Sequence, residues 1–283
     1  MSLAADTHMG RLELRVRDMP TMLTYYTQGV GLEPLADEPG SVTLGHAGTP
    51  IVRLTEARDL RPARRTDAGL FHTAVLYEEL PALAATLVRM YQHYAHTYAG
   101  TGDHLVSQAF YFTDPEGNGV ELYHDRPRDQ WQWTDNQVQM ATLYIDPAEF
   151  VAKHLAGLDP DRLPPTQAQL GHVHLQVGDV ATARDFYVDA LGFDQTAVLG
   201  GSALFVAAGG YHHHMAMNVW NSAGAGPRQN TLGMGVVDIL VPTADELGKA
   251  DERLRFSGHT PTFDGRTLSV LDPWRNEIRL TVG

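Results

Sequence analysis

Arg11–Glu33 reads RLELRVRDMPTMLTYYTQGVGLE, and His172–Asp194 reads HVHLQVGDVATARDFYVDALGFD; these two stretches decide the fold. At a constant offset they carry the same residues at Leu14/Leu175, Val16/Val177, Asp18/Asp179, Thr21/Thr182, Tyr26/Tyr187 and Gly31/Gly192. Each stretch begins with the apolar alternation of a β-strand and continues through an Asp-led turn into an amphipathic helix that ends at a glycine. The chain therefore contains a structural repeat.

A second pair of similar segments extends the repeat. Gly69–Tyr77 (GLFHTAVLY) and Leu232–Val241 (LGMGVVDILV) read as strands, and each leads into a helical pattern. Further along, Thr113–Leu122 (TDPEGNGVEL) and Leu271–Leu280 (LDPWRNEIRL) read as hairpins. In both, Asp-Pro followed by Gly or Asn marks a turn between alternating segments.

Together these segments predict four modules, each a strand, a helix and three further strands (βαβββ). Modules one to four are predicted over residues 6–64, 65–128, 169–222 and 232–283. The first two form an N-terminal half (6–128) and the last two a C-terminal half (169–283), with a connector (129–168) that carries one short helix over 147–156. We expect an α+β fold in which the modules pair into two cup-shaped mixed sheets.

Composition excludes several classes of function. Lys and Arg number 21 against 34 Asp and Glu, a formal charge of −13, which disfavours nucleic acid and anionic membranes as partners. No apolar run is long enough to cross a bilayer, and Met1–Gly10 lacks the features of a signal peptide, so we expect a cytoplasmic protein. The chain has 14 His and no Cys, so a transition-metal site has to use imidazole and carboxylate ligands.

Strand alternation predicts which side chains line the cups. In Gly171–Val177 the apolar residues pack under the helices, so His172, His174 and Gln176 face the concave side. In the same way Val120 and Leu122 pack under the helices, which turns Glu121 and Tyr123 into the cup.

The other predicted strands provide fewer candidate metal ligands. Modules one and four place Arg11, Glu13, Arg15 and Arg279 on the concave face, and these cannot make a metal site. Tyr211–Met217 (YHHHMAM) is predicted as a strand with three consecutive histidines, and alternation does not decide which of them face the cup.

Several linked motifs resemble one known family. GHVHLQV, GGYHHHMAMNVW, GLFHTAVLY and GDHLVSQAFYFTDPEGNGVELYHDRPR are similar to segments of the bacillus-type catechol 2,3-dioxygenases. These enzymes belong to the vicinal oxygen chelate superfamily, the paired βαβββ fold of glyoxalases, bleomycin-resistance proteins and extradiol dioxygenases. The resemblance covers all four modules.

The resemblance implies Fe(II), less often Mn(II), held by two His and one carboxylate, with open positions for a catecholate and O2. It assigns the metal ligands to His172, His213 and Glu121, so that modules two and three form the active cup together. It makes His72 a catalytic residue next to the metal, and Tyr111 a hydrogen-bond donor to the substrate. The acid/base histidine that such enzymes carry shortly before the second His ligand is missing; His104, His174, His212 and His214 are the alternatives.

Three functions are compatible with these motifs. The first is an extradiol ring-cleaving dioxygenase that acts on an aromatic diol with O2. The second is a glyoxalase-like lyase or isomerase, in which His72, Glu121, His172 and His213 together bind Zn(II), Ni(II) or Co(II). The third is a non-enzymatic module that sequesters a ligand, which needs no buried His and Glu set. A homodimer is compatible with all three.

Overall fold

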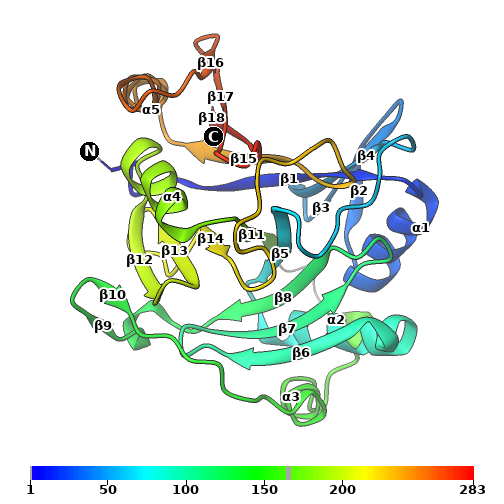
Figure 1. The fold of residues 1–283 in the computed structure, drawn as a ribbon. Helices are drawn as coiled ribbons and strands as arrows, with labels where there is room; N and C mark the ends of the chain where they lie inside the picture. The colour runs from blue at the N-terminus through cyan, green and yellow to red at the C-terminus, as the bar shows by residue number, and fades with distance from the viewer. Residues whose placement is uncertain (1, 164–166) are drawn as a thin grey trace.

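The computed structural model describes residues 2–163 and 167–283, and its main elements are two mixed sheets of eight strands each (Figure 1). In the first sheet the strand order is β16 (Thr262–Phe263), β17 (Thr267–Leu271), β18 (Glu277–Val282), β15 (Gly233–Val241), β1 (His8–Val16), β4 (Thr49–Glu56), β3 (Ser41–His46), β2 (Glu33–Glu38). In the second it is β12 (Asp194–Leu199), β13 (Ala203–Ala207), β14 (Met215–Asn218), β11 (Ala168–Gln176), β5 (Gly69–Tyr77), β8 (Gly119–Asp125), β7 (Ser107–Thr113), β6 (Tyr98–Asp103).

Each sheet combines one module from each half of the chain. Modules one and four share the first sheet through the antiparallel pair of β1 and β15, and modules two and three share the second through that of β5 and β11. The predicted α+β fold and its two paired sheets are confirmed. The limits 6–128 and 169–283 stay a prediction, and residues 164–166 of the connector lie outside the described residues.

Each module supplies a helix or a short helical segment that covers the convex face of its sheet. The helices are α1 (Met19–Thr24) with the π-helix η1 (Tyr25–Val30), α2 (Leu80–Tyr94), α4 (Val180–Arg184) with the π-helix η5 (Asp185–Ala190), and α5 (Ala244–Phe256). The connector holds a strand pair, β9 (Trp133–Thr134) and β10 (Gln137–Val138), and the predicted helix, α3 (Pro147–His154). Single 3-10 turns are η2 (Ala95–Thr97), η3 (Arg128–Gln130) and η4 (Pro160–Arg162). None of the described helices is both long and apolar enough to cross a membrane.

The repeated Asp residues begin the repeated helices. The side chain of Asp18 accepts a hydrogen bond from the backbone N–H of Thr21 at 3.1 Å, and Asp179 accepts one from Thr182 at 2.7 Å. Such N-caps satisfy N–H groups that the first turn of a helix leaves without a partner. The apolar sides of the strands pack beneath these helices in one core that includes Leu14, Leu122, Val173 and Leu175.

One predicted strand is wrong in its first half. Strand β14 begins at Met215, whereas Tyr211–His214 forms a loop between β13 and β14. Gly209 and Gly210 precede this loop with φ angles of 61° and 67°, a left-handed conformation that ends the β13 extension and that glycine adopts readily. The three consecutive histidines therefore do not alternate between the faces of a sheet.

Candidate metal centre

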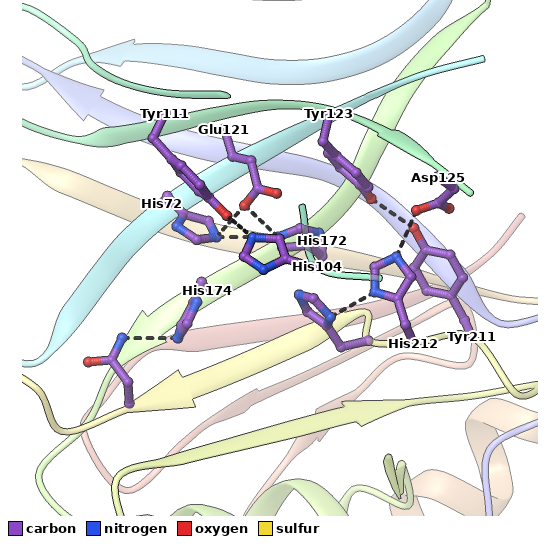
Figure 2. A network of polar contacts seen from close by, with 12 residues as sticks. His72, His104, Tyr111, Glu121, Tyr123, Asp125, His172, His174, Tyr211 and His212 are labelled. Atoms are coloured by element: carbon purple, nitrogen blue, oxygen red, sulfur yellow. Dashed lines mark hydrogen bonds and ion pairs between the residues drawn. The ribbon is translucent and has the colours of Figure 1, made fainter. Parts of the chain in front are cut away.

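Three buried side chains from adjacent strands meet on the concave face of the second sheet. His72 lies on β5, Glu121 on β8 and His172 on β11 (Figure 2). Ala74 of β5 is the register partner of both Glu121 and His172, and His72 points to the same face because it lies two residues earlier on β5.

The spacing of the three groups fits a metal ion. His72 Nε2 lies 2.9 Å and His172 Nε2 lies 3.1 Å from Glu121 Oε2, and the two nitrogens are 3.2 Å apart. Ligands about 2.1 Å from an ion and at right angles to each other are separated by about 3.0 Å. The three donor atoms therefore have the spacing of one triangular face of an octahedron, the arrangement of a 2-His-1-carboxylate triad.

The protonation states also suit a metal. Burial alone would raise the pKa of Glu121, but the imidazoles of His172 and His72 keep this pKa well below its usual range. Burial lowers the pKa of His172 to about 4, although Glu121 opposes the shift. Near neutral pH the carboxylate is thus ionised and the His172 ring neutral, the forms that bind a cation.

Only one of the two ring nitrogens of His172, Nε2, has polar contacts with the described residues. Its Nδ1 is buried and has no hydrogen-bond partner among the described residues, so all its polar contacts are made by the Nε2 that faces His72 and Glu121. Within residues 2–163 and 167–283, His72, Glu121 and His172 are the one group of three or more candidate ligands whose donor atoms all lie within 4.8 Å of one another.

His213 lies next to this group rather than within it. Its ring centroid is 4.1 Å from that of His172 and 5.1 Å from that of Phe205. Its Nδ1 lies 2.8 Å from Nδ1 of His212. Of the three ligands expected from the resemblance, the structure brings Glu121 and His172 together and adds His72 as their third neighbour. A ligand role for His213 stays a prediction.

Tyr111 lies at the edge of the same group, on β7. Its ring centroid is 5.7 Å from that of His72, and burial together with the Glu121 charge raises its pKa well above the usual value. The hydroxyl lies 2.7 Å from Nε2 of His104, whose Nδ1 lies 2.7 Å from the carbonyl of Ala141. Because a carbonyl only accepts, His104 carries its proton on Nδ1, and Tyr111 donates to Nε2.

Sequence reasoning missed two residues that extend this network. Asp125 accepts a hydrogen bond from His212, and Tyr211 pairs with Tyr123 through hydroxyls 2.8 Å apart (Figure 2). Alternation along β8 could have placed Asp125 on the face of Glu121 and Tyr123, since the three are spaced by two residues. Tyr211 lies in the loop before β14, for which alternation has no meaning.

The equivalent place in the first sheet holds a different set of charges. Asp238 of β15 lies between two arginines, with Arg11 Nε at 3.0 Å and Arg279 Nε at 2.6 Å. Guanidinium groups do not ligate cations, and both arginines pair with the one carboxylate at this place. That modules one and four hold no metal stays a prediction.

Comparisons with known proteins agree with this architecture. Residues 8–122 and 169–280 match the family model described as the glyoxalase/bleomycin resistance protein/dioxygenase superfamily. A curated relative from Bacillus subtilis (strain 168), named catechol-2,3-dioxygenase, is 33% identical over 277 residues, which cover 96% of each chain.

Two solved structures share the fold. A candidate dioxygenase of Bacillus subtilis superposes with a TM-score of 0.67 at 10% identity and covers all of this chain and 86% of its own. Glyoxalase I of Zea mays has a TM-score of 0.57 at 16% identity and covers 98% of this chain and 92% of its own. On the family match and the 33% identity, the chain belongs to the glyoxalase/bleomycin resistance protein/dioxygenase superfamily.

Proposed function

We propose that the protein is a metal-dependent extradiol dioxygenase that cleaves the ring of a catechol-type diol with O2. The observation that carries the proposal is the triangle of His72 Nε2, Glu121 Oε2 and His172 Nε2, with sides of 2.9, 3.1 and 3.2 Å. Three protein ligands on one face leave the opposite positions of an ion open for two substrate oxygens and O2. The 33% identity to a protein named catechol-2,3-dioxygenase supports the same reaction.

In this proposal His72, Glu121 and His172 hold the metal, and Fe(II) is the expected ion, with Mn(II), Zn(II) and Ni(II) as alternatives. Bound there, the ion would supply positive charge that favours the ionised diol, and a redox centre for O2. His72 thus moves from a catalytic role beside the metal to a ligand role. His213 has its ring 4.1 Å from His172 and takes the place beside the metal.

The protein groups around the triad bind and orient the diol. Tyr111 carries a hydroxyl that stays protonated, because burial and the Glu121 charge raise its pKa. Its single proton, which is donated to His104 Nε2 in the unliganded protein, turns to a substrate oxygen when the diol binds. Phe71 packs edge-on against His174 and the half-exposed Trp220, at centroid distances of 5.0 and 5.3 Å. These rings offer an apolar wall for a planar aromatic substrate.

The test is anaerobic loading with Fe(II), followed by O2 uptake with catechol. We expect one O2 consumed per diol, a yellow ring-fission product, and both atoms of 18O2 in that product. Glu121→Ala should lose bound iron and activity together, whereas His213→Ala should keep its iron and lose activity. The second variant separates the two roles considered for His213.

Two results would count against the proposal. Iron-loaded protein that consumes no O2 with catechol or its alkyl and carboxyl derivatives would remove it. Metal-dependent isomerisation of a hemithioacetal by the Zn(II)- or Ni(II)-loaded protein would instead support the glyoxalase-like alternative. In that case His213 should prove to be a fourth ligand, so that His213→Ala loses metal.

A further inference from the structure

A pocket of about 380 Å³ lies where two linkers of the chain meet. Residues 57–68 join β4 to β5 and residues 219–232 join β14 to β15, so each linker crosses from one sheet to the other (Figure 1). A β-bridge of Arg61 with Thr231 ties the two linkers together. This linker pocket has the size of small-molecule sites and shares no lining residue with the metal centre.

The linker pocket concentrates positive charge on a protein that is acidic as a whole. Its charged lining residues are three arginines, Arg61, Arg64 and Arg228, and one carboxylate, Asp67. Asp67 pairs with Arg61 at 3.1 Å, whereas neither Arg64 nor Arg228 forms an ion pair with any described carboxylate. Because the whole chain has a formal charge of −13, this local excess of guanidinium groups is not a consequence of composition.

The N-terminal half of the chain presents Arg64 on a fixed turn. The backbone N–H of Arg64 donates to Asp67 Oδ2 at 3.0 Å, and the backbone N–H of Asp67 donates to the Arg64 carbonyl at 3.0 Å. The turn keeps Arg64 at the edge of the linker pocket, where its exposed guanidinium makes no hydrogen bond with any described residue. All five of its N–H donors are therefore available to a ligand without the loss of a contact within the protein.

The C-terminal half holds Arg228 in place through neutral groups. Nη1 donates to the Asn276 side chain at 2.9 Å, and Nη2 donates to the Met234 carbonyl at 3.0 Å and to the Thr231 hydroxyl at 3.3 Å. Its Nε is buried and has no hydrogen-bond partner among the described residues. The guanidinium is thus fixed at the pocket without a carboxylate to balance its charge.

The pKa of Arg228 reflects this imbalance. Burial lowers the pKa to about 10, and the nearby positive charge of Arg15 adds to the shift. Asp272 and Asp67 oppose it only in part. An anion in the linker pocket would favour the charged form of Arg228.

We infer that the linker pocket binds a small dianion, a dicarboxylate or a phosphate group, held by the guanidinium groups of Arg61 and Arg64 in the field of Arg228. Three arginines against one carboxylate leave an excess of positive charge that such a ligand neutralises. The planar fork of donors on a guanidinium matches the oxygens of both carboxylate and phosphate. The inference does not depend on the proposed function, because the pocket and the metal centre share no residue.

Binding is measured by isothermal titration of the full chain with succinate, with inorganic phosphate and with succinamide, which has the size of succinate and no charge. The metal-free protein is used, so that no anion binds to an ion at the metal centre. We expect one anion bound per chain and no binding of succinamide. Binding of succinate alone assigns the pocket to dicarboxylates, and binding of phosphate alone assigns it to phosphate groups.

Arg64→Gln should weaken the binding at least about 10-fold, because it removes charged hydrogen bonds to the ligand and leaves the hydrogen bonds within the protein in place. Arg65→Gln is the matched control: it removes the same charge from the next residue of the linker, which is exposed and does not line the pocket. This variant should bind the anion like the wild type. Equal weakening in both variants would show attraction to a basic segment rather than a site, and would overturn the inference. Failure of the wild type to bind either succinate or phosphate would overturn it as well.

Discussion

At the scale of single residues, Glu121 is the side chain on which the candidate metal centre should depend most. It supplies the one carboxylate in the group and is only 2% exposed. Glu121→Gln keeps the size of the side chain and removes its charge. Because partners outside the ligand sphere already contribute 10- to 100-fold, we expect the loss of this ligand to weaken Zn(II) binding by more than about 100-fold in isothermal titration.

The matched control for this change is Glu78→Gln, an exposed carboxylate just after β5 in the same module. It should bind Zn(II) like the wild type. Equal Zn(II) affinity in Glu121→Gln and Glu78→Gln would mean that the ion is held elsewhere.

Tyr111 allows a second test at this scale. Tyr111→Phe removes the hydroxyl that lies 2.7 Å from His104 Nε2 and leaves the ring in place. Zn(II) binding should be unchanged, because the hydroxyl is not a ligand in the proposed site, whereas kcat with Fe(II) should fall about 10- to 100-fold. An Fe(II)-loaded variant with full kcat would show that Tyr111 is a packing residue.

At the scale of elements, two equivalent hairpins tie the sheets together. In the β7–β8 turn, Asp114 accepts hydrogen bonds from the Asn118 side chain at 2.8 Å and from the Tyr26 hydroxyl of η1 at 3.2 Å. In the β17–β18 turn, Asp272 accepts from Asn276 at 2.8 Å and from Tyr187 of η5 at 2.9 Å. Each buried Asp thus joins a hairpin of one sheet to a helix of the other.

The buried Asp114 makes the free energy of unfolding depend on pH. Burial raises the pKa of Asp114 to about 6, against the hydrogen bonds that lower it, while the unfolded chain has a value near about 3.9. The folded state therefore binds more protons between these values, and its stability falls as the pH rises through them. Two pKa units correspond to about 3 kcal/mol.

Asp114→Asn imitates the protonated side chain and isolates this contribution from those of other carboxylates. The free energy of unfolding of the wild type, measured in urea and compared with that of the variant, should decrease by about 2–3 kcal/mol from pH 4 to pH 7. Parallel curves for the two proteins would contradict the prediction. Asp272 remains in both proteins and cancels in the comparison.

Whether a residue lies on a regular strand or in a loop explains how much of the site could be predicted from the sequence. Alternation placed Glu121 and His172 correctly because β8 and β11 are regular strands with fixed register against β5. Alternation could not place the side chains of Tyr211–His214, because Gly209 and Gly210 end the extended conformation before this segment. The contact of His104 with Tyr111 also depends on the path of a loop, since the ring is fixed by the carbonyl of Ala141 in the connector.

At the scale of the whole molecule, the candidate site joins the two halves of the chain. His72 and Glu121 come from the N-terminal half and His172 from the C-terminal half, through the antiparallel pair of β5 and β11 at the centre of the second sheet. The first sheet has Arg11, Asp238 and Arg279 in the equivalent place, so its two modules are joined by ion pairs that need no metal. A bound ion would therefore stabilise one of the two antiparallel strand pairs, β1–β15 and β5–β11, that join the halves.

This arrangement predicts that a divalent metal stabilises the folded protein as a whole. A ligand that binds only the folded state at 100 times its Kd adds about 2.7 kcal/mol to the free energy of unfolding. For a chain of this size that corresponds to a rise in Tm of roughly 5 °C. Zn(II) added to metal-free protein should produce this rise, and a chelator should reverse it. Glu121→Gln should show no rise while Glu78→Gln behaves like the wild type; a rise in both variants would place the ion outside the triangle of His72, Glu121 and His172.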